Sequence, residues 1–161
     1  MAGSQADPAD GLRIRRLSCE DLAQFAPLLS AYRLEMDPNT PPESRELEAA
    51  TALLSSPVAE VMGGFLDETL SALAVVFDLP EAIANGRAGQ LDDLYVAPRV
   101  RGRRLAQRMI EAVAGIGRAR GWVHLRWLVP ENNAAALRTY QRFAHPAPWK
   151  SYVVWPGNGA A

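Results

Sequence analysis

The sequence predicts a mixed α/β fold, in which a mostly antiparallel central sheet carries helices on both faces. Three observations favour this class: apolar residues alternate at a spacing of two in several short segments, they recur at three and four in others, and turn residues separate the segments. With 161 residues, 48% of them hydrophobic, the chain is long enough for one domain with a substantial core. We expect residues 1–10 to form a disordered tail and residues 11–161 to form that single domain.

The expected elements follow the order β-α-α-β-β-β-α-β-α-β. Ser18 ends the first strand and is a suitable N-cap for the helix that follows. Asp37-Pro38 ends this helix, Pro57 ends the next one, and Gly121 is a suitable C-terminal cap for the third. The segments are a strand over 12–18, helices over 20–36 and 42–55, a hairpin of strands over 58–66 and 70–79, a strand over 90–98, a helix over 105–120, a strand over 122–130, a helix over 132–143 and a last strand over 149–156.

Charge is divided unevenly along the chain. The residues up to Asp93 include sixteen acids and six bases, a balance of about −10, whereas those from Arg99 onward include two acids and eleven bases, a balance of about +9. The simplest interpretation is that two oppositely charged surfaces solvate the fold. A nucleic-acid binder would need an exposed basic face, but the arginines from Arg99 to Arg120 cluster at the two ends of a helix with an apolar middle, which argues against that class.

Other features of the sequence argue against membrane and metal-binding classes. No apolar run approaches the roughly 20 residues that cross a bilayer, and the first residues lack the basic start and apolar middle of a secretion signal. We therefore expect a cytoplasmic protein with no membrane partner. The single cysteine, Cys19, cannot form an internal disulfide and lacks the companion Cys and His residues of a zinc site, so we expect no metal.

The stretch RGRRLAQRMI, residues 101–110, places three arginines and a glycine between an apolar strand and an apolar helix. A helix start offers free backbone N–H groups and the positive end of the helix dipole, so with arginine side chains it forms a site for an anion. Donors spread from Arg101 to Ala106 suit a diphosphate better than a single carboxylate. The spacing is neither that of a Walker loop nor that of a dinucleotide-binding GxGxxG loop. The alternative is a solvated, arginine-rich helix start.

The longer stretch LYVAPRVRGRRLAQRMIEAV resembles the acyl-coenzyme A binding core of the GNAT superfamily of N-acetyltransferases, an apolar strand ending in valine followed by [RQ]xxGx[GA]. Arg101 and Ala106 occupy the first and last positions of this pattern, and Arg104 stands where the family has glycine. The family's later motif NxxAxx[LF]Y is similar to the segment from Asn133 to Tyr140, with threonine at the usually apolar position.

The resemblance covers residues 12–155 and implies the acyl-CoA N-acyltransferase fold and an N-acetyltransferase enzyme with acetyl-CoA as its acyl donor. It implies acetylation of a primary amine, on a small molecule or a protein, by direct attack on the thioester. The alternative is a non-catalytic module of the same fold that binds CoA as a sensor or regulator. Many relatives pair as dimers through their last strands, and the aromatic C-terminal segment permits a homodimer here.

By the same resemblance, coenzyme A lies between two strands, residues 91–96 and 123–129, where they splay apart. Its pantetheine arm pairs with backbone groups of the first strand, its diphosphate rests on the arginine-rich loop, and Asn133 bonds the pantetheine amides. The implied cofactor-binding residues are Leu94, Tyr95, Val96, Arg101, Gly102, Arg103, Arg104, Leu105, Ala106 and Asn133.

Acetyl transfer requires an uncharged amine, although an alkylamine has a pKa of roughly 10.4, so a base must take a proton. Asp92 and Asp93 lie in the strand beside the expected thioester, and only one of two successive strand residues faces the site. Comparison with related enzymes favours Asp92 acting through water, with Asp93 as the second candidate; solvation of the strand edge is the alternative to both. Tyr140 occupies the family's position for the acid that protonates the leaving thiolate, although a tyrosine on an apolar helix face is also typical of a core.

The resemblance also implies that the acceptor binds beside the first two helices and their connection. Tyr32 and Glu35 lie in this region as candidate acceptor-binding residues, and further acids follow at Asp37, Glu43, Glu46 and Glu48. An acidic pocket predicts a cationic acceptor, such as a small amine or an amino group on a protein. Solvation alone would also explain these acids.

Overall fold

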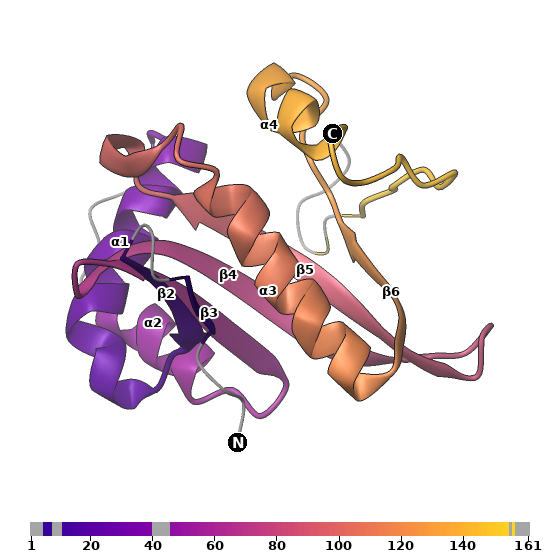
Figure 1. Cartoon of the computed structure of the whole chain (residues 1–161), viewed down its shortest axis with the longest axis horizontal. Coiled ribbons are helices and arrows are strands. Elements are labelled where there is room, and N and C mark those ends of the chain that lie inside the picture. Colours follow the sequence, from indigo (N-terminus) through magenta and orange to yellow (C-terminus); the bar gives the residue numbers. More distant parts are fainter. Residues whose placement is uncertain (1–4, 8–10, 40–45, 155, 157–161) are drawn as a thin grey trace. The chain divides into compact units, whose positions relative to one another are not determined.

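A six-stranded sheet in the order β1-β2-β3-β4-β5-β6 organises the first of two units in this protein (Figure 1). The computed structural model describes residues 5–7, 11–39, 46–154 and 156; the first unit ends at Leu128 and the second begins at Val129. Neighbouring strands are antiparallel except for β5 and β6, which are parallel. The strands are β1 (Gln5–Asp7), β2 (Leu12–Arg16), β3 (Ala59–Leu66), β4 (Thr69–Glu81), β5 (Gly86–Val96) and β6 (Trp122–Trp127).

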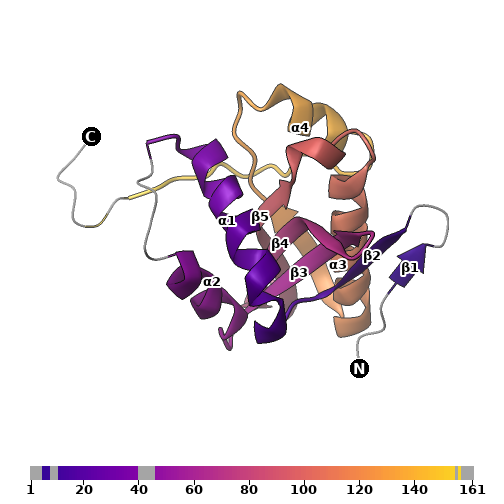
Figure 2. The same ribbon diagram turned by 90° about the vertical axis from the view of Figure 1, so that its left-hand side faces the viewer.

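Helices cover both faces of this sheet. α3 (Leu105–Arg120) lies on one face, and α1 (Leu22–Met36) and α2 (Glu46–Leu54) lie on the other, as Figures 1 and 2 show together. Two short 3-10 turns, η1 (Cys19–Asp21) and η2 (Pro98–Val100), precede α1 and α3. The core contains Phe25 of α1, Leu73 of β4 and Met109 of α3, each fully buried. Apolar packing against the sheet therefore fixes both helical layers.

The second unit contains the short helix α4 (Ala134–Tyr140) and, in its described part, no strand. The strand expected over 149–156 is therefore wrong for residues 149–154, and Tyr152 and Val154 are 88% and 85% exposed. An apolar alternation forms a strand only where a neighbouring strand takes up its backbone hydrogen bonds, and this segment has none in the described chain.

The expected fold class, a mixed and mostly antiparallel sheet with helices on both faces, is confirmed. The expected tail contains one short strand, because β1 pairs with β2; residues 1–4 and 8–10 lie outside the described part of the chain. The chain divides into two compact units, which are described separately. The single domain expected over 11–161 stays a prediction.

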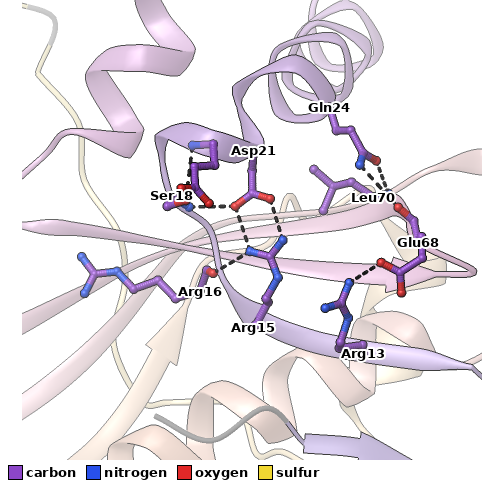
Figure 3. A network of polar contacts seen from close by, with 9 residues as sticks. Arg13, Arg15, Arg16, Ser18, Asp21, Gln24, Glu68 and Leu70 are labelled. Carbon is purple, nitrogen blue, oxygen red and sulfur yellow. Dashed lines mark hydrogen bonds and ion pairs between the residues drawn. The ribbon is translucent and has the colours of Figure 1, made fainter. Parts of the chain in front are cut away.

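The connection between β2 and α1 is fixed by a helix cap and an ion pair (Figure 3). Ser18 caps η1: its hydroxyl accepts from the N–H of Glu20, and its own N–H donates to Asp21 Oδ2 (2.9 Å). Arg15 of β2 donates from both terminal nitrogens to the two oxygens of Asp21 (2.8 and 2.6 Å). The hydrogen bonds from Arg15 hold the pKa of Asp21 below its ordinary value. The cap predicted at Ser18 is confirmed.

We expect Asp21→Asn to lower the free energy of unfolding by about 1–2 kcal/mol near pH 7, because it removes the charge that Arg15 pairs with. The folded-state pKa of Asp21 lies below its ordinary 3.8, so this stabilisation is fully present above that value and is lost as the pH falls through the folded pKa. Urea unfolding at several pH values measures it.

The matched control is Glu68→Gln, which removes the partner of Arg13 in an ion pair whose carboxylate is 84% exposed. Its effect should be about 0.5 kcal/mol or less. As the pH falls, the carboxylate of Asp21 in the wild type is protonated. If the difference in the free energy of unfolding between the wild type and Asp21→Asn then stays constant, the assigned ion pair is contradicted.

Candidate active site

In the described chain, no strand lies along one edge of the last residues of β5. β6 pairs with β5 only as far as Leu91, whereas β4 pairs with it as far as Val96. Ala97 donates its N–H to the carbonyl of Ser71 at the β4 side (2.9 Å). Because backbone groups alternate between the two edges of a strand, those of Leu94 and Val96 face away from β4. The amides of a ligand can pair with this edge as an added strand would.

β5 contains a bulge at Asp92. Val75 of β4 pairs with Asp93 and Val76 pairs with Leu91, so Asp92 is an extra residue on β5. Asp92 is exposed. The bulge thus gives different surroundings to the two neighbouring acids, of which the sequence comparison favours Asp92 as the base.

Asp93 lies beneath α1 and is partly buried. Tyr32 donates its hydroxyl to Asp93 Oδ1 (2.7 Å), and the ring of Tyr32 lies 5.3 Å from that of Tyr95, centroid to centroid. Burial raises the pKa of Asp93, and the hydrogen bond from Tyr32 opposes that shift. Asp93 is therefore a stronger base than an exposed aspartate.

The turn between β5 and α3 leads into a helix start without a side-chain cap. Gly102 has a φ of +81°, and a Cβ there would meet nothing within 4 Å. Arg104 is the N-cap, yet its side chain makes no capping hydrogen bond. The N–H of Arg108 makes a helical hydrogen bond to the carbonyl of Arg104 (3.0 Å), so the N–H groups of the three residues between them point out of the helix end. Such donors can bind an anion.

The side chain of Arg101 turns back from this helix start. Its Nε donates to the carbonyl of Val96 (2.9 Å), and its Nη2 donates to both carboxylate oxygens of Glu35 on α1 (2.8 and 2.7 Å). The guanidinium also lies 5.6 Å from the ring centroid of Tyr95. The sequence assigns Arg101 to a phosphate and Glu35 to an acceptor, but the structure pairs the two side chains with each other.

The second unit holds the other two predicted residues. Asn133 is the N-cap of α4, and its Oδ1 accepts from the N–H of Ala136 (3.1 Å). Tyr140 ends α4, its ring meets that of Phe143 edge-on at 6.2 Å, and burial raises the pKa of its hydroxyl. The contacts expected between these residues and acetyl-CoA stay predictions.

Direct contacts bring together six of the thirteen predicted residues of the first unit, and they are Tyr32, Glu35, Asp93, Tyr95, Val96 and Arg101. Arg103 and Arg104 are exposed, and Leu105 is buried in the core, so only its backbone is available to a ligand. The contact between α1 and β5 was not expected from the sequence. Its signal was the spacing of Tyr32 and Glu35, which places both on one face of a helix.

The chain belongs to the acetyltransferase (GNAT) family, because the profile of that family matches residues 27–145. The match includes both sequence motifs and defines the protein as an acetyltransferase enzyme. A comparison with curated proteins finds no significant match.

Solved structures of acetyltransferases share this fold. The ribosomal-protein-alanine N-acetyltransferase from Brucella melitensis biovar Abortus 2308 is 31% identical, with a TM-score of 0.79 and coverage of 89% of this chain and 98% of that chain. An aminoglycoside N-acetyltransferase in complex with CoA is 16% identical, with a TM-score of 0.73 and coverage of 94% and 99%. An aminoglycoside acetyltransferase from an uncultured soil metagenomic sample, in complex with trehalose, is 20% identical, with a TM-score of 0.72 and coverage of 90% and 95%.

The part of the chain that the structure describes has neither a membrane-spanning helix nor a metal-ligand cluster. None of the helices there is both long and apolar enough to cross a bilayer. No three His, Cys, Asp or Glu side chains of that part of the chain gather into a group that could hold a metal ion. The cytoplasmic location expected from the sequence stays a prediction.

Arg104 has a φ of +58° and a ψ of +20°, the left-handed conformation that glycine adopts most easily. We expect Arg104→Gly to raise the free energy of unfolding by about 0.5–1 kcal/mol, since it relieves this backbone strain at an exposed position. Denaturant unfolding measures the change.

Arg103→Gly is the matched control, because it removes the same charge from the adjacent exposed position, where φ is not positive. It should be neutral or destabilising. Equal effects of the two variants would show that charge, rather than backbone conformation, decides stability in this turn.

Proposed function

We propose that this acetyltransferase moves the acetyl group of acetyl-CoA to a primary amine, which attacks the thioester directly. The observation that carries the proposal is that the open edge of β5 leads, through residues 97–104, to the uncapped start of α3. The edge pairs with the amides of the pantetheine arm, and the N–H groups at the helix start hold the diphosphate.

The backbone and charges of the turn suit the phosphates of coenzyme A. The open space beside Gly102 lets a phosphate approach the backbone closely. Arg103 and Arg104 are exposed and add positive charge, while Leu105 and Ala106 contribute backbone donors at the first turn of α3. Bound acetyl-CoA supplies the activated acyl group.

Asp93 is the base in this proposal: it takes a proton from the acceptor ammonium through water, and the free amine then attacks the thioester. Its burial beneath α1 raises its pKa, which increases its strength as a proton acceptor. Tyr32 orients the carboxylate by donating to Oδ1. Tyr140 is the proposed acid for the departing thiolate: burial raises the pKa of its hydroxyl, so it stays protonated.

We propose an α-amino group of a protein as the acceptor. The neighbour at 31% identity is named for acetylation of alanine in a ribosomal protein, and the only amine of an alanine residue is its α-amino group. The pKa of an α-amine is about 7.7–8.0, well below the roughly 10.4 of a lysine side chain, so an aspartate can deprotonate it more readily. The aminoglycoside acetyltransferases are only 16% and 20% identical to this chain, so their likeness concerns the fold alone. It gives no support for a sugar amine as the acceptor.

Calorimetry with CoA and a thiol-release assay with acetyl-CoA test this function together. The acceptors are a peptide beginning with alanine, the same peptide with a blocked N-terminus and an internal lysine, and an aminoglycoside. We expect CoA to bind and the free α-amine to be acetylated fastest. Tight CoA binding without turnover on any acceptor would favour the non-catalytic sensor instead.

We expect Tyr140→Phe to lower kcat by about 100-fold or more while leaving the Kd for CoA nearly unchanged, because the phenol acts only when the thiolate departs. The thiol-release assay and calorimetry measure the two quantities. A loss of CoA affinity that matches the loss of kcat would indicate a binding or structural role for Tyr140.

Asp93→Asn and its neighbour Asp92→Asn form a matched pair that separates the two candidate bases. A base works only when deprotonated, so the contribution of Asp93 appears as the pH rises through its raised pKa. The wild type should therefore show an acidic limb in its pH profile of kcat that Asp93→Asn lacks and Asp92→Asn keeps. The reverse pattern would assign the base to Asp92.

A further inference from the structure

We infer that Glu35 and Arg101 form a positioning pair for the phosphate-binding turn, and that neither side chain binds a substrate directly. The inference rests on the proposed function, in which this turn holds the diphosphate of CoA. It gives both residues roles that differ from those expected from the sequence.

Three hydrogen bonds direct the guanidinium of Arg101 toward α1 and β5. Two go to the carboxylate of Glu35 (2.8 and 2.7 Å), and one goes from Nε to the carbonyl of Val96 (2.9 Å). The side chain of Arg101 thus joins α1 and the end of β5 to the turn between β5 and α3. The planar fork of arginine is suited to such a joint, because its donors leave in fixed directions.

The charges also argue against Arg101 as a phosphate ligand. The carboxylate of Glu35 lies 2.7 Å from the guanidinium, so an anion at the start of α3 experiences little net charge from the pair. The backbone turns sharply at Gly102, with its φ of +81°, directly after Arg101. Holding Arg101 therefore fixes where the chain enters this turn and the helix start beyond it.

The helix that carries Glu35 is itself tied to β5. Tyr32 lies one helical turn before Glu35 and donates to Asp93 (2.7 Å). α1 is thus held to β5 at Asp93 and to the turn at Arg101. The position of the phosphate donors relative to the open edge of β5 consequently depends on α1.

A positioning pair and a direct phosphate ligand predict opposite effects of two substitutions. If Arg101 bound phosphate, Glu35→Gln would release its charge and tighten CoA binding, and Arg101→Lys would keep affinity, since lysine is a competent phosphate-binding point charge. If the pair positions the turn, Glu35→Gln breaks it. Arg101→Lys breaks it too, because an ammonium lacks the planar fork that meets Glu35 and Val96 together.

Calorimetry of CoA with the wild type, the two single variants and the double variant tests the inference. We expect each single variant to weaken binding by about twofold to fivefold, the range that corresponds to losing an ion pair at a partly exposed site. The double variant should be no weaker than the weaker single variant, because the two residues act as one unit. Unchanged or tighter binding in Glu35→Gln would overturn the positioning role.

Three controls separate this role from others. Glu68→Gln makes the same charge change in an exposed ion pair outside the candidate site, with Arg13, and should leave CoA affinity unaltered. Pantetheine, which lacks the diphosphate, should bind Glu35→Gln as it binds the wild type. In steady-state assays the KM for acetyl-CoA should rise while the KM for the acceptor stays constant; a rise in the acceptor KM alone would return Glu35 to the acceptor site and overturn the inference.

Failure of the inference differs from failure of the proposed function. If the wild type releases no heat with CoA or acetyl-CoA, the proposed function is wrong and the positioning role falls with it. If the wild type binds CoA and the variants bind it equally well, only the positioning role is wrong. Equal urea midpoints of all forms would exclude unfolding as the cause of weaker binding.

Discussion

The antiparallel pairing of β4 with β5 is the constraint on which the candidate site depends. β4 is buried on both faces from Leu70 to Val76, so α1 and α3 pack against a strand that cannot shift without exposing core. β5 remains paired with β4 to Val96 after β6 has ended its pairing at Leu91. β4 therefore supports a stretch of β5 whose other edge has no neighbouring strand in the described chain. A site of this kind needs a strand that is rigid on one side and open on the other.

Local interactions explain what could be predicted from the sequence. Ser18 and Gly121 are end signals that act within a few residues, and both are found as caps. The anion site at the start of α3 follows from the same local logic, since any helix start presents free N–H groups. The class of fold and the elements around the site were therefore accessible from spacing and turn chemistry.

Contacts between distant segments explain what could not be predicted. The bulge at Asp92 exists only in the pairing of β5 with β4, so an alternation rule applied to one strand cannot find it. The ring of Trp122 packs against Gly89 and Gly117, where a Cβ would collide with it. The residues next to each glycine in the sequence do not indicate that Trp122 lies there. The pairing of Glu35 with Arg101 likewise depends on where α1 lies. The partner of a side chain thus depends on how distant segments pack together. Free backbone N–H groups, in contrast, depend only on where a helix begins.

The start of α3 lacks the side-chain cap that the starts of η1 and α4 have. Ser18 and Asn133 accept hydrogen bonds from N–H groups at the starts of η1 and α4, which satisfies those donors within the chain. Arg104 has no acceptor to offer in the same position, and its left-handed backbone adds strain. A side-chain cap stands on extended backbone, as at Ser18, and its oxygen would take up an N–H that the proposed diphosphate site uses. The absence of a cap at Arg104 therefore keeps the donors of α3 available to an anion, at a cost in stability that the packing of Leu105 and Met109 in the core offsets.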